Sequence, residues 1–278
     1  MNLEKIRTKT KDGLFLDGLI YKSKNNNKTV IINIHGTAGN FYIHNFIDEM
    51  SIEYTKNNID FMAVNNRGHD FISEFQKVNN ENTEIIGYAY EKFDDCIYDI
   101  SAWVNFASRL KYRNIILQGH SLGAIKTTYY TYKTGDKKIK GLILASPPDI
   151  VGLFSRRETP VKLTNNLLLI KNKNSFQLIS KRTFDELRKR GGHADIFNTY
   201  DENKNSVLKK INIPIFAFLG DVKEATIMNP VKALKILYNK SQKTNFSFKV
   251  IHGANHVYYK KEKIVAKEVA KWVKKNFN

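Results

Sequence analysis

The residues most suggestive of chemistry lie in the run GHSLG at residues 119–123. The run fits the pattern G-x-S-x-G, in which a serine hydroxyl between two glycines serves as a nucleophile toward an acyl carbonyl. The bare pattern is weak, because its three fixed positions match by chance in about one chain in ten of this length. Its setting strengthens it, since a strand-like run, NIILQ, precedes it and a helix-like run, LGAIKTTYYTY, follows it. Ser121 is therefore a candidate nucleophile at a sharp strand-to-helix turn, where glycines relieve backbone crowding.

The elements that would position this turn alternate between strands and helices. Strand patterns occur at residues 14–21 (a hairpin or a kinked strand), 29–36, 59–68, 114–118, 139–146, 213–221 and 246–253. Helix patterns occur at residues 44–57, 90–110, 122–132, 230–240 and 260–277. This alternation predicts an α/β fold with a mostly parallel central sheet flanked by helices. It stops at residues 149–211, which show short helical patterns and turn signals but no clear buried strand. We expect one domain, residues 1–278, with 149–211 as a lid inserted within it.

In element order and motifs, nearly the whole chain resembles the α/β-hydrolase superfamily. The motifs are HGTAGN after the first long buried strand, NNRGHD after the next, GHSLG at the turn, GDVKEA after a late strand and GANH near the end. The resemblance implies a central sheet with helices on both sides. It also implies a serine esterase-like catalytic triad whose nucleophile, acid and base follow one another along the chain.

That order restricts the choice of the catalytic base. Five of the seven histidines precede the late carboxylate loop, which leaves His252 and His256. His252 lies at the expected end of a strand, whereas His256 lies beyond Gly253 on a loop that can bend toward Ser121. We predict His256 as the base that accepts the proton of Ser121.

The catalytic acid is harder to assign, because the chain departs from the family pattern. The family usually carries the acid about three residues after the glycine that ends the preceding strand, and Lys223 occupies that position. Asp221 comes two residues earlier and Glu224 one residue later, where a longer side chain could offset the shift. We rank Glu224 first, Asp221 second and Asp149 third.

The resemblance also implies an oxyanion hole formed by two backbone N–H groups. The expected donors are Leu122, at the start of the helix after the nucleophile, and Thr37 in HGTAGN, with Ala38 as the alternative to Thr37. One such donor stabilises the tetrahedral oxyanion by roughly 3 kcal/mol.

The charge of the chain raises a different class of function. The net charge is +18, which would attract nucleic acids or anionic membranes. However, the excess consists mostly of lysines mixed with asparagines along the whole chain, not of arginines and aromatic residues gathered in one groove. We interpret it as a solvated basic surface, as we do for Arg156 and Arg157 in the expected lid, which could otherwise favour an anionic substrate.

Absent motifs and targeting signals narrow the class further. The sequence has no H-E-x-x-H, no cysteine pair, no G-x-x-x-x-G-K and no G-x-G-x-x-G, so we expect no metal or cofactor. With Cys96 as the single cysteine, no apolar signal segment and no long apolar run, we expect a cytoplasmic protein without a membrane span. We expect a small-molecule acyl substrate and no specific nucleic-acid partner, and we leave open whether the chain forms a homodimer.

The function that follows from the resemblance is serine-dependent hydrolysis of a carboxylic ester of a small-to-medium acyl group. Thioesters and amides use the same tetrahedral chemistry and stay open. Two rivals belong to other classes. One is a protein of this fold that binds a ligand, or performs lyase or acyl-transfer chemistry, without net hydrolysis. The other is a polyanion-binding protein.

Overall fold

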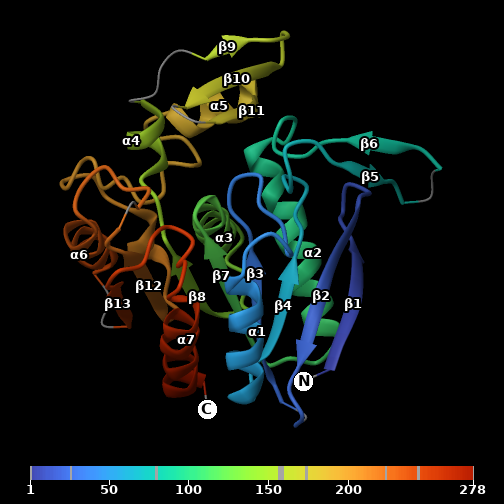
Figure 1. The fold of residues 1–278 in the computed structure, drawn as a ribbon, viewed down its shortest axis with the longest axis vertical. Helices are drawn as coiled ribbons and strands as arrows, with labels where there is room; N and C mark the ends of the chain where they lie inside the picture. The colour runs from blue at the N-terminus through green and yellow to red at the C-terminus, as the bar shows by residue number, and fades with distance from the viewer. Residues whose placement is uncertain are drawn as a thin grey trace.

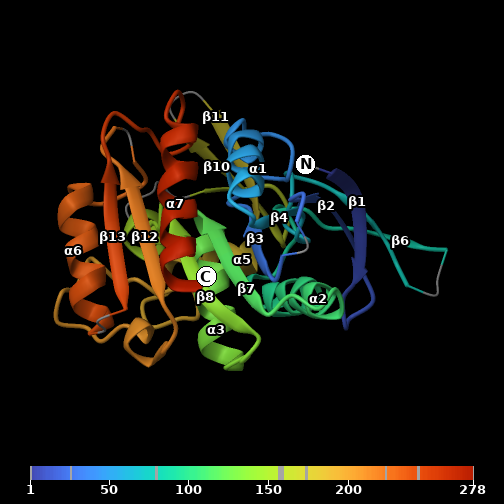
Figure 2. The ribbon, with the colours of Figure 1, turned by 90° about the horizontal axis from the view of Figure 1, so that it is seen from below.

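The computed structural model describes residues 2–25, 27–78, 81–155, 160–172, 175–222, 224–242 and 245–277. A twisted central sheet runs through the molecule, with helices packed on both of its faces (Figures 1 and 2). In the described part of the chain this sheet has eight strands. In sheet order they are β1 (Asn2–Lys9), β2 (Phe15–Lys22), β4 (Asp60–Val64), β3 (Thr29–Ile34), β7 (Asn114–His120), β8 (Ile139–Ala145), β12 (Ile215–Gly220) and β13 (Phe246–Ile251).

The direction of the strands follows their burial. β1 pairs antiparallel with β2, and β2 pairs antiparallel with β4 at the same edge. From β4 to β13 all neighbouring strands are parallel. Every residue of β3 and β4 is buried, which explains why these strands are mostly apolar and do not alternate between apolar and polar residues. The predicted α/β fold with a mostly parallel central sheet is confirmed. The hairpin or kinked strand expected at residues 14–21 is one strand, β2, and its partner β1 was not predicted.

The helices divide into two layers, one on each face. α1 (Phe46–Lys56) and α7 (Glu262–Phe277) pack together over one face and share one hydrophobic cluster with it. α2 (Cys96–Arg109), α3 (Leu122–Thr134) and α6 (Pro230–Ser241) contribute to the cluster on the other face, with the short helices η1 (Phe93–Asp95) and η2 (Val207–Lys210) nearby. Figure 2 shows the sheet between these layers. None of the helices in the described ranges is long and apolar enough to cross a membrane.

The chain between β8 and β12 forms a separate small layer. It contains α4 (Ile150–Ser155), β9 (Val161–Lys162), β10 (Leu167–Asn172), β11 (Ser175–Ser180) and α5 (Lys181–Arg188). The strands form an antiparallel sheet in the order β11, β10, β9, stacked beyond one end of the central sheet (Figure 1). The expectation of no buried strand in residues 149–211 is therefore wrong. Leu168, Ile170 and Ile179 are buried. β10 begins with four consecutive apolar residues, 167–170, which the sequence analysis did not interpret as a strand.

Another hairpin extends from the edge of the molecule that carries β1 and β2. It consists of β5 (Glu74–Gln76) and β6 (Thr83–Ile85), paired antiparallel. Figure 1 shows it projecting away from the sheet beside β1 and β2. Three-residue strands that are mostly exposed leave no periodic apolar signal in the sequence.

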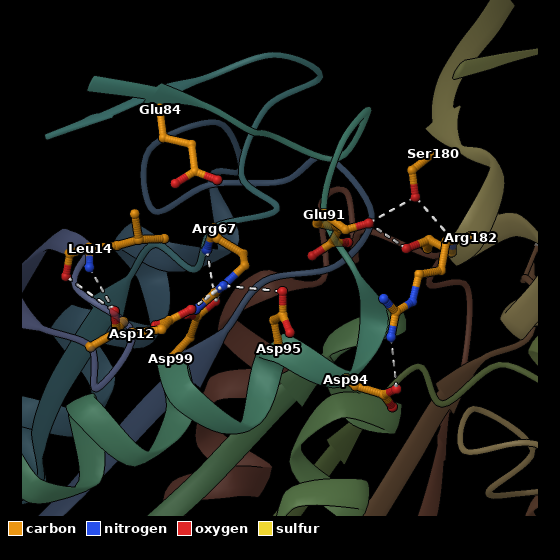
Figure 3. Close-up of polar contacts among 12 residues, drawn as sticks. Asp12, Leu14, Arg67, Glu84, Glu91, Asp94, Asp95, Asp99, Ser180 and Arg182 are labelled. Carbon is orange, nitrogen blue, oxygen red and sulfur yellow. Dashed lines mark hydrogen bonds and ion pairs between the residues drawn. The ribbon is translucent and has the colours of Figure 1, made fainter. Parts of the chain in front are cut away.

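The loop before η1 connects the 149–211 segment to the body of the protein. The backbone carbonyl of Glu91 accepts hydrogen bonds from Ser180 Oγ at 2.8 Å and Thr183 Oγ1 at 2.6 Å (Figure 3). The Glu91 carboxylate points inward and lies 2.7 Å from Lys126 Nζ of α3. Both side chains are buried, with 2% and 1% of their surface exposed. One residue therefore contacts both the 149–211 segment and the helix that follows Ser121.

A second buried charge lies in the loop after β4. The Arg67 guanidinium contacts Asp99 at 2.8 Å, Asp12 at 2.7 Å and Asp95 at 3.3 Å (Figure 3). The Arg67 backbone N–H also donates to Asp99, at 2.9 Å. Burial opposes the charge, but the Asp99 and Asp12 carboxylates raise the pKa of Arg67, so the arginine stays charged. The network connects this loop to α2 and to the β1–β2 hairpin.

From the buried Lys126–Glu91 pair we predict a large loss of stability when one partner is removed. In Lys126→Met, the Glu91 carboxylate loses its counter-charge, and burial already raises its pKa. We expect the free energy of unfolding to fall by about 3–5 kcal/mol, as measured by urea denaturation at pH 7. The double variant Lys126→Met/Glu91→Gln should recover most of this loss. A single variant as stable as wild type would contradict the prediction.

Candidate active site

Ser121 lies in a strained turn between β7 and α3. Its φ and ψ angles are 54° and −121°, a conformation that residues with a side chain rarely adopt. The flanking glycines make the turn sterically feasible. A Cβ on Gly119 would lie 2.3 Å from the carbonyl oxygen of Gly123, and a Cβ on Gly123 would lie 2.2 Å from the carbonyl oxygen of Ile34. The turn therefore requires glycine at both positions and leaves Ser121 partly exposed.

A cavity of about 290 Å³ opens at this turn. Ser121 and His256 line it together with Gly36, Thr37 and His44. Its apolar wall is formed by Pro148, Ile150, Leu153, Phe154 and Val257. Gln177 of β11 also lines it. The 149–211 segment therefore supplies part of the wall, from both α4 and β11.

The predicted base and one of the candidate acids are paired at this cavity. His256 Nδ1 lies 2.7 Å from Glu224 Oε2. A carboxylate only accepts hydrogen bonds, so Nδ1 carries the proton and Nε2 has its lone pair available as a base. The other oxygen of Glu224, Oε1, accepts from the Gly220 backbone N–H and from Ser146 Oγ, both at 2.8 Å. The Glu224 side chain is almost completely buried.

The other two candidate acids lie elsewhere. Asp221 accepts from His252 at 2.9 Å and from the Gly253 N–H at 2.7 Å, and these hydrogen bonds lower its pKa. His252 is 86% exposed. Asp149 is buried and accepts from the Gly152 N–H, the Thr199 hydroxyl and the Tyr200 N–H. The structure thus brings Glu224, and neither of these aspartates, to His256.

The two predicted oxyanion donors flank Ser121. Leu122 is the first residue of α3, where an N–H has no acceptor within the helix. Thr37 lines the cavity, whereas its alternative Ala38 is not among the described lining residues. The loop that carries Thr37 passes close to the nucleophile, because a Cβ on Gly36 would lie 2.9 Å from Ser121 Cβ. The loop that carries Thr37 and the start of α3 therefore both lie next to Ser121.

His120 contributes a contact that the sequence analysis missed. Its Nε2 lies 2.8 Å from the carbonyl oxygen of His256 and must carry the proton, because a carbonyl only accepts. Its ring packs against those of Phe46 and Tyr258. Burial, with the nearby His256, holds the pKa of His120 well below its usual range, so the ring is neutral. The sequence did offer a signal for this contact. His120 lies at the end of a buried strand, where a polar side chain needs a hydrogen-bond partner.

His35 fixes the loop that carries Thr37. Its Nδ1 donates to the Gly36 carbonyl at 2.9 Å, and its Nε2 accepts from the Asn66 backbone N–H at 3.0 Å. Burial lowers the pKa of His35 to about 3. In the charged ring both nitrogens carry protons, and Nε2 could not accept from the Asn66 N–H. The hydrogen bond to Asn66 therefore requires the neutral ring.

Three residues discussed from the sequence, Lys223, Arg156 and Arg157, lie outside the described residues. Within the described ranges, no cluster of three histidine, cysteine, aspartate or glutamate side chains could hold a metal ion.

The fold and this site together define an α/β-hydrolase. The model of the family described as serine aminopeptidase, S33 (Hydrolase_4), matches residues 25–263. Because this match spans most of the chain, the protein belongs to that family. No curated protein sequence matches the chain.

Solved structures with the same fold include several esterases. Est1E from Butyrivibrio proteoclasticus, with ferulic acid bound, has a TM-score of 0.72 at 19% identity and covers 97% of this chain and 98% of its own. The esterase domain of a Rhodothermus marinus protein has a TM-score of 0.68 at 14% identity and covers 99% of each chain. The Pyrococcus furiosus esterase Pf2001 has a TM-score of 0.66 at 17% identity, covering 100% of this chain and 92% of its own. At these identities the similarity shows a shared fold.

The buried neutral His35 predicts a loss of stability in acid. The unfolded chain binds a proton at this residue below pH 6.5, whereas the folded chain does so only near pH 3. Between these values, stability should fall by up to about 1.4 kcal/mol per pH unit because of this residue. In His35→Gln, urea unfolding between pH 6.5 and 4 should show a shallower decline than in wild type. His193→Gln, which removes a half-exposed imidazole, is the matched control. Equal slopes in wild type and His35→Gln would contradict the prediction.

Proposed function

We propose that the protein is a serine hydrolase that cleaves a carboxylic ester of a small-to-medium acyl group. Ser121 is the nucleophile, His256 the base and Glu224 the acid. The observation that carries the proposal is the 2.7 Å contact between His256 Nδ1 and Glu224 Oε2 at the cavity that Ser121 lines. This is the arrangement in which a carboxylate orients an imidazole and stabilises its charged form beside a serine.

The reaction follows from these positions. Nε2 of His256 takes the proton of Ser121 Oγ as Oγ bonds to the acyl carbon, and the carbonyl oxygen becomes an oxyanion. The N–H groups of Leu122 and Thr37 stabilise this charge. When the tetrahedral intermediate collapses, the bond to the alcohol breaks and His256 protonates the leaving oxygen. A water molecule, deprotonated by His256, then attacks the acyl-enzyme and restores Ser121 while releasing the acid.

The lining of the cavity favours a neutral acyl group. Among the described residues that line it, none is an aspartate, glutamate, lysine or arginine. Burial is the main cause that lowers the pKa values of His44 and His120, which favours neutral rings. An aminopeptidase must bind the free α-ammonium group of its substrate, and an ammonium group without a counter-charge is costly to desolvate. This favours an ester over the aminoacyl amide that the family's description suggests.

We further propose that residues 149–211 act as a lid over the site within one domain, residues 1–278. Leu153 and Phe154 of α4, with Gln177 of β11, line the cavity. Side chains from a segment of this kind determine which acyl or alcohol groups fit, while the triad stays on the central sheet.

The nucleophile can be tested with a fluorophosphonate probe, which reacts with activated serines. We expect wild type to be labelled, Ser121→Ala to remain unlabelled, and wild type to hydrolyse a short p-nitrophenyl ester but not an aminoacyl p-nitroanilide. Ser206→Ala, which removes another buried serine hydroxyl, should be labelled like wild type. A folded wild type without labelling would refute the hydrolase and favour a ligand-binding role, and anilide cleavage would refute the ester assignment.

The acid can be tested by two matched amide substitutions. Glu224→Gln should lower kcat on the p-nitrophenyl ester by about 10³- to 10⁴-fold, because the amide no longer stabilises the imidazolium. Asp221→Asn, which alters the neighbouring carboxylate, should keep kcat within about threefold of wild type. A large loss confined to Asp221→Asn would overturn the assignment of Glu224.

A further inference from the structure

A chain of hydroxyl groups leads from the protein core to the Glu224 carboxylate. Tyr258 OH lies 2.8 Å from Ser146 Oγ, and Ser146 Oγ lies 2.8 Å from Glu224 Oε1. A carboxylate only accepts, so the single Ser146 proton points to Glu224. Tyr258 must then donate to Ser146. The direction of both hydrogen bonds is fixed, and the chain ends on the oxygen opposite the one that binds His256.

We propose that Ser146 and Tyr258 are positioning residues for the catalytic acid, because their hydroxyls hold the Glu224 carboxylate in the orientation that binds His256. The inference rests on the proposed function, since this orientation affects catalysis only if Glu224 is the acid. Neither hydroxyl residue is among those that line the cavity, so both act through Glu224 and not on substrate.

The backbone holds Ser146 in a strained conformation at the end of β8. It follows the last residue of β8, and its N–H donates to the Phe218 carbonyl of β12 at 2.9 Å. Its φ angle is 48°, in the left-handed region that costs a residue with a side chain about 1–2 kcal/mol. Because β8 lies between β7 and β12 in the sheet, the side chain stands between the strands that lead to Ser121 and Glu224.

Tyr258 is a rigid donor. It is fully buried, and its ring packs against those of Phe46, Phe218 and His120 at centroid distances of 5.5–5.7 Å. Burial also raises the pKa of its hydroxyl well above the usual range, so it remains protonated over the pH range in which a histidine base works. Its φ angle of 60° is again left-handed.

A glutamate needs this support more than an aspartate would. Its side chain has one more rotatable bond, so more orientations compete with the one that reaches His256. Two donors, the Gly220 N–H and the Ser146 hydroxyl, converge on Oε1 and remove that freedom. The Ala225 N–H contacts Oε2 at 3.2 Å.

The test is a double-mutant cycle in kcat on the p-nitrophenyl ester. Ser146→Ala should lower kcat by about 10- to 100-fold, as expected when a hydrogen bond to a charged group is lost, with KM unchanged. Tyr258→Phe, which keeps the ring packing, should lower kcat by about 3- to 10-fold. Because Tyr258 acts through Ser146, the double variant should match Ser146→Ala alone. The low-field proton signal of the His256–Glu224 hydrogen bond should shift in both single variants.

Matched controls separate this role from stability. Ser206→Ala and Tyr130→Phe each remove a buried hydrogen-bonded hydroxyl away from the site, and both should keep wild-type kcat. If Ser146→Ala does not fold, Tyr258→Phe and the proton signal carry the test. Single variants with wild-type kcat and an unmoved signal, or effects that add in the double variant, would overturn the inference. A wild type that neither turns over ester nor reacts with the fluorophosphonate would instead refute the proposed function.

Discussion

The site depends on close backbone packing where β7 turns into α3. Here β3, β7 and α3 approach so closely that no side-chain carbon fits between them at Gly119 or Gly123. A contact between backbone atoms cannot be relieved by a change of side-chain rotamer, so this packing fixes the Ser121 turn relative to the loop after β3. That loop carries Thr37. The relation between the proposed nucleophile and the proposed oxyanion donors is therefore set by the central sheet itself, which is what pre-organised charge stabilisation requires.

Buried charges fix the layers around this turn. Arg67 joins the loop after β4 to α2, and Glu91 contacts both α3 and the 149–211 segment. The two are linked sterically, since a Cβ on Gly68 would lie 2.1 Å from the Glu91 carboxylate. Buried ion pairs add little net stability, because desolvation offsets their attraction. Their directional contacts instead specify one arrangement of the loops and helices, and the backbone carbonyl of Glu91 joins the 149–211 segment to it.

The sequence could predict those parts of the fold that have a strong local pattern. The continuous β-branched runs of β3 and β7 and the long amphipathic pattern of α2 were sufficient to predict the sheet and its layers. The strands β10 and β11 were missed because their apolar runs, four residues in β10 and two in β11, are short and lie among turn signals. Chain order left His252 and His256, and the position of His256 on a loop beyond Gly253 decided between them. Spacing could not separate Asp221 from Glu224, which lie three residues apart. The path of their loop separates them, directing Asp221 to His252 and Glu224 to His256.

The residues proposed for catalysis and for positioning the acid follow four neighbouring parallel strands. In sheet order, β7, β8, β12 and β13 are followed by Ser121, Ser146, Glu224 and His256. Ser121 and Ser146 both have left-handed backbones, a conformation that persists only when the surroundings over-determine it. Both are the first residues beyond a buried strand. The backbone N–H of each still donates a hydrogen bond to the neighbouring strand, to Ala145 from Ser121 and to Phe218 from Ser146. The parallel sheet thus supplies the rigidity, and the short turns after its strands supply the functional groups.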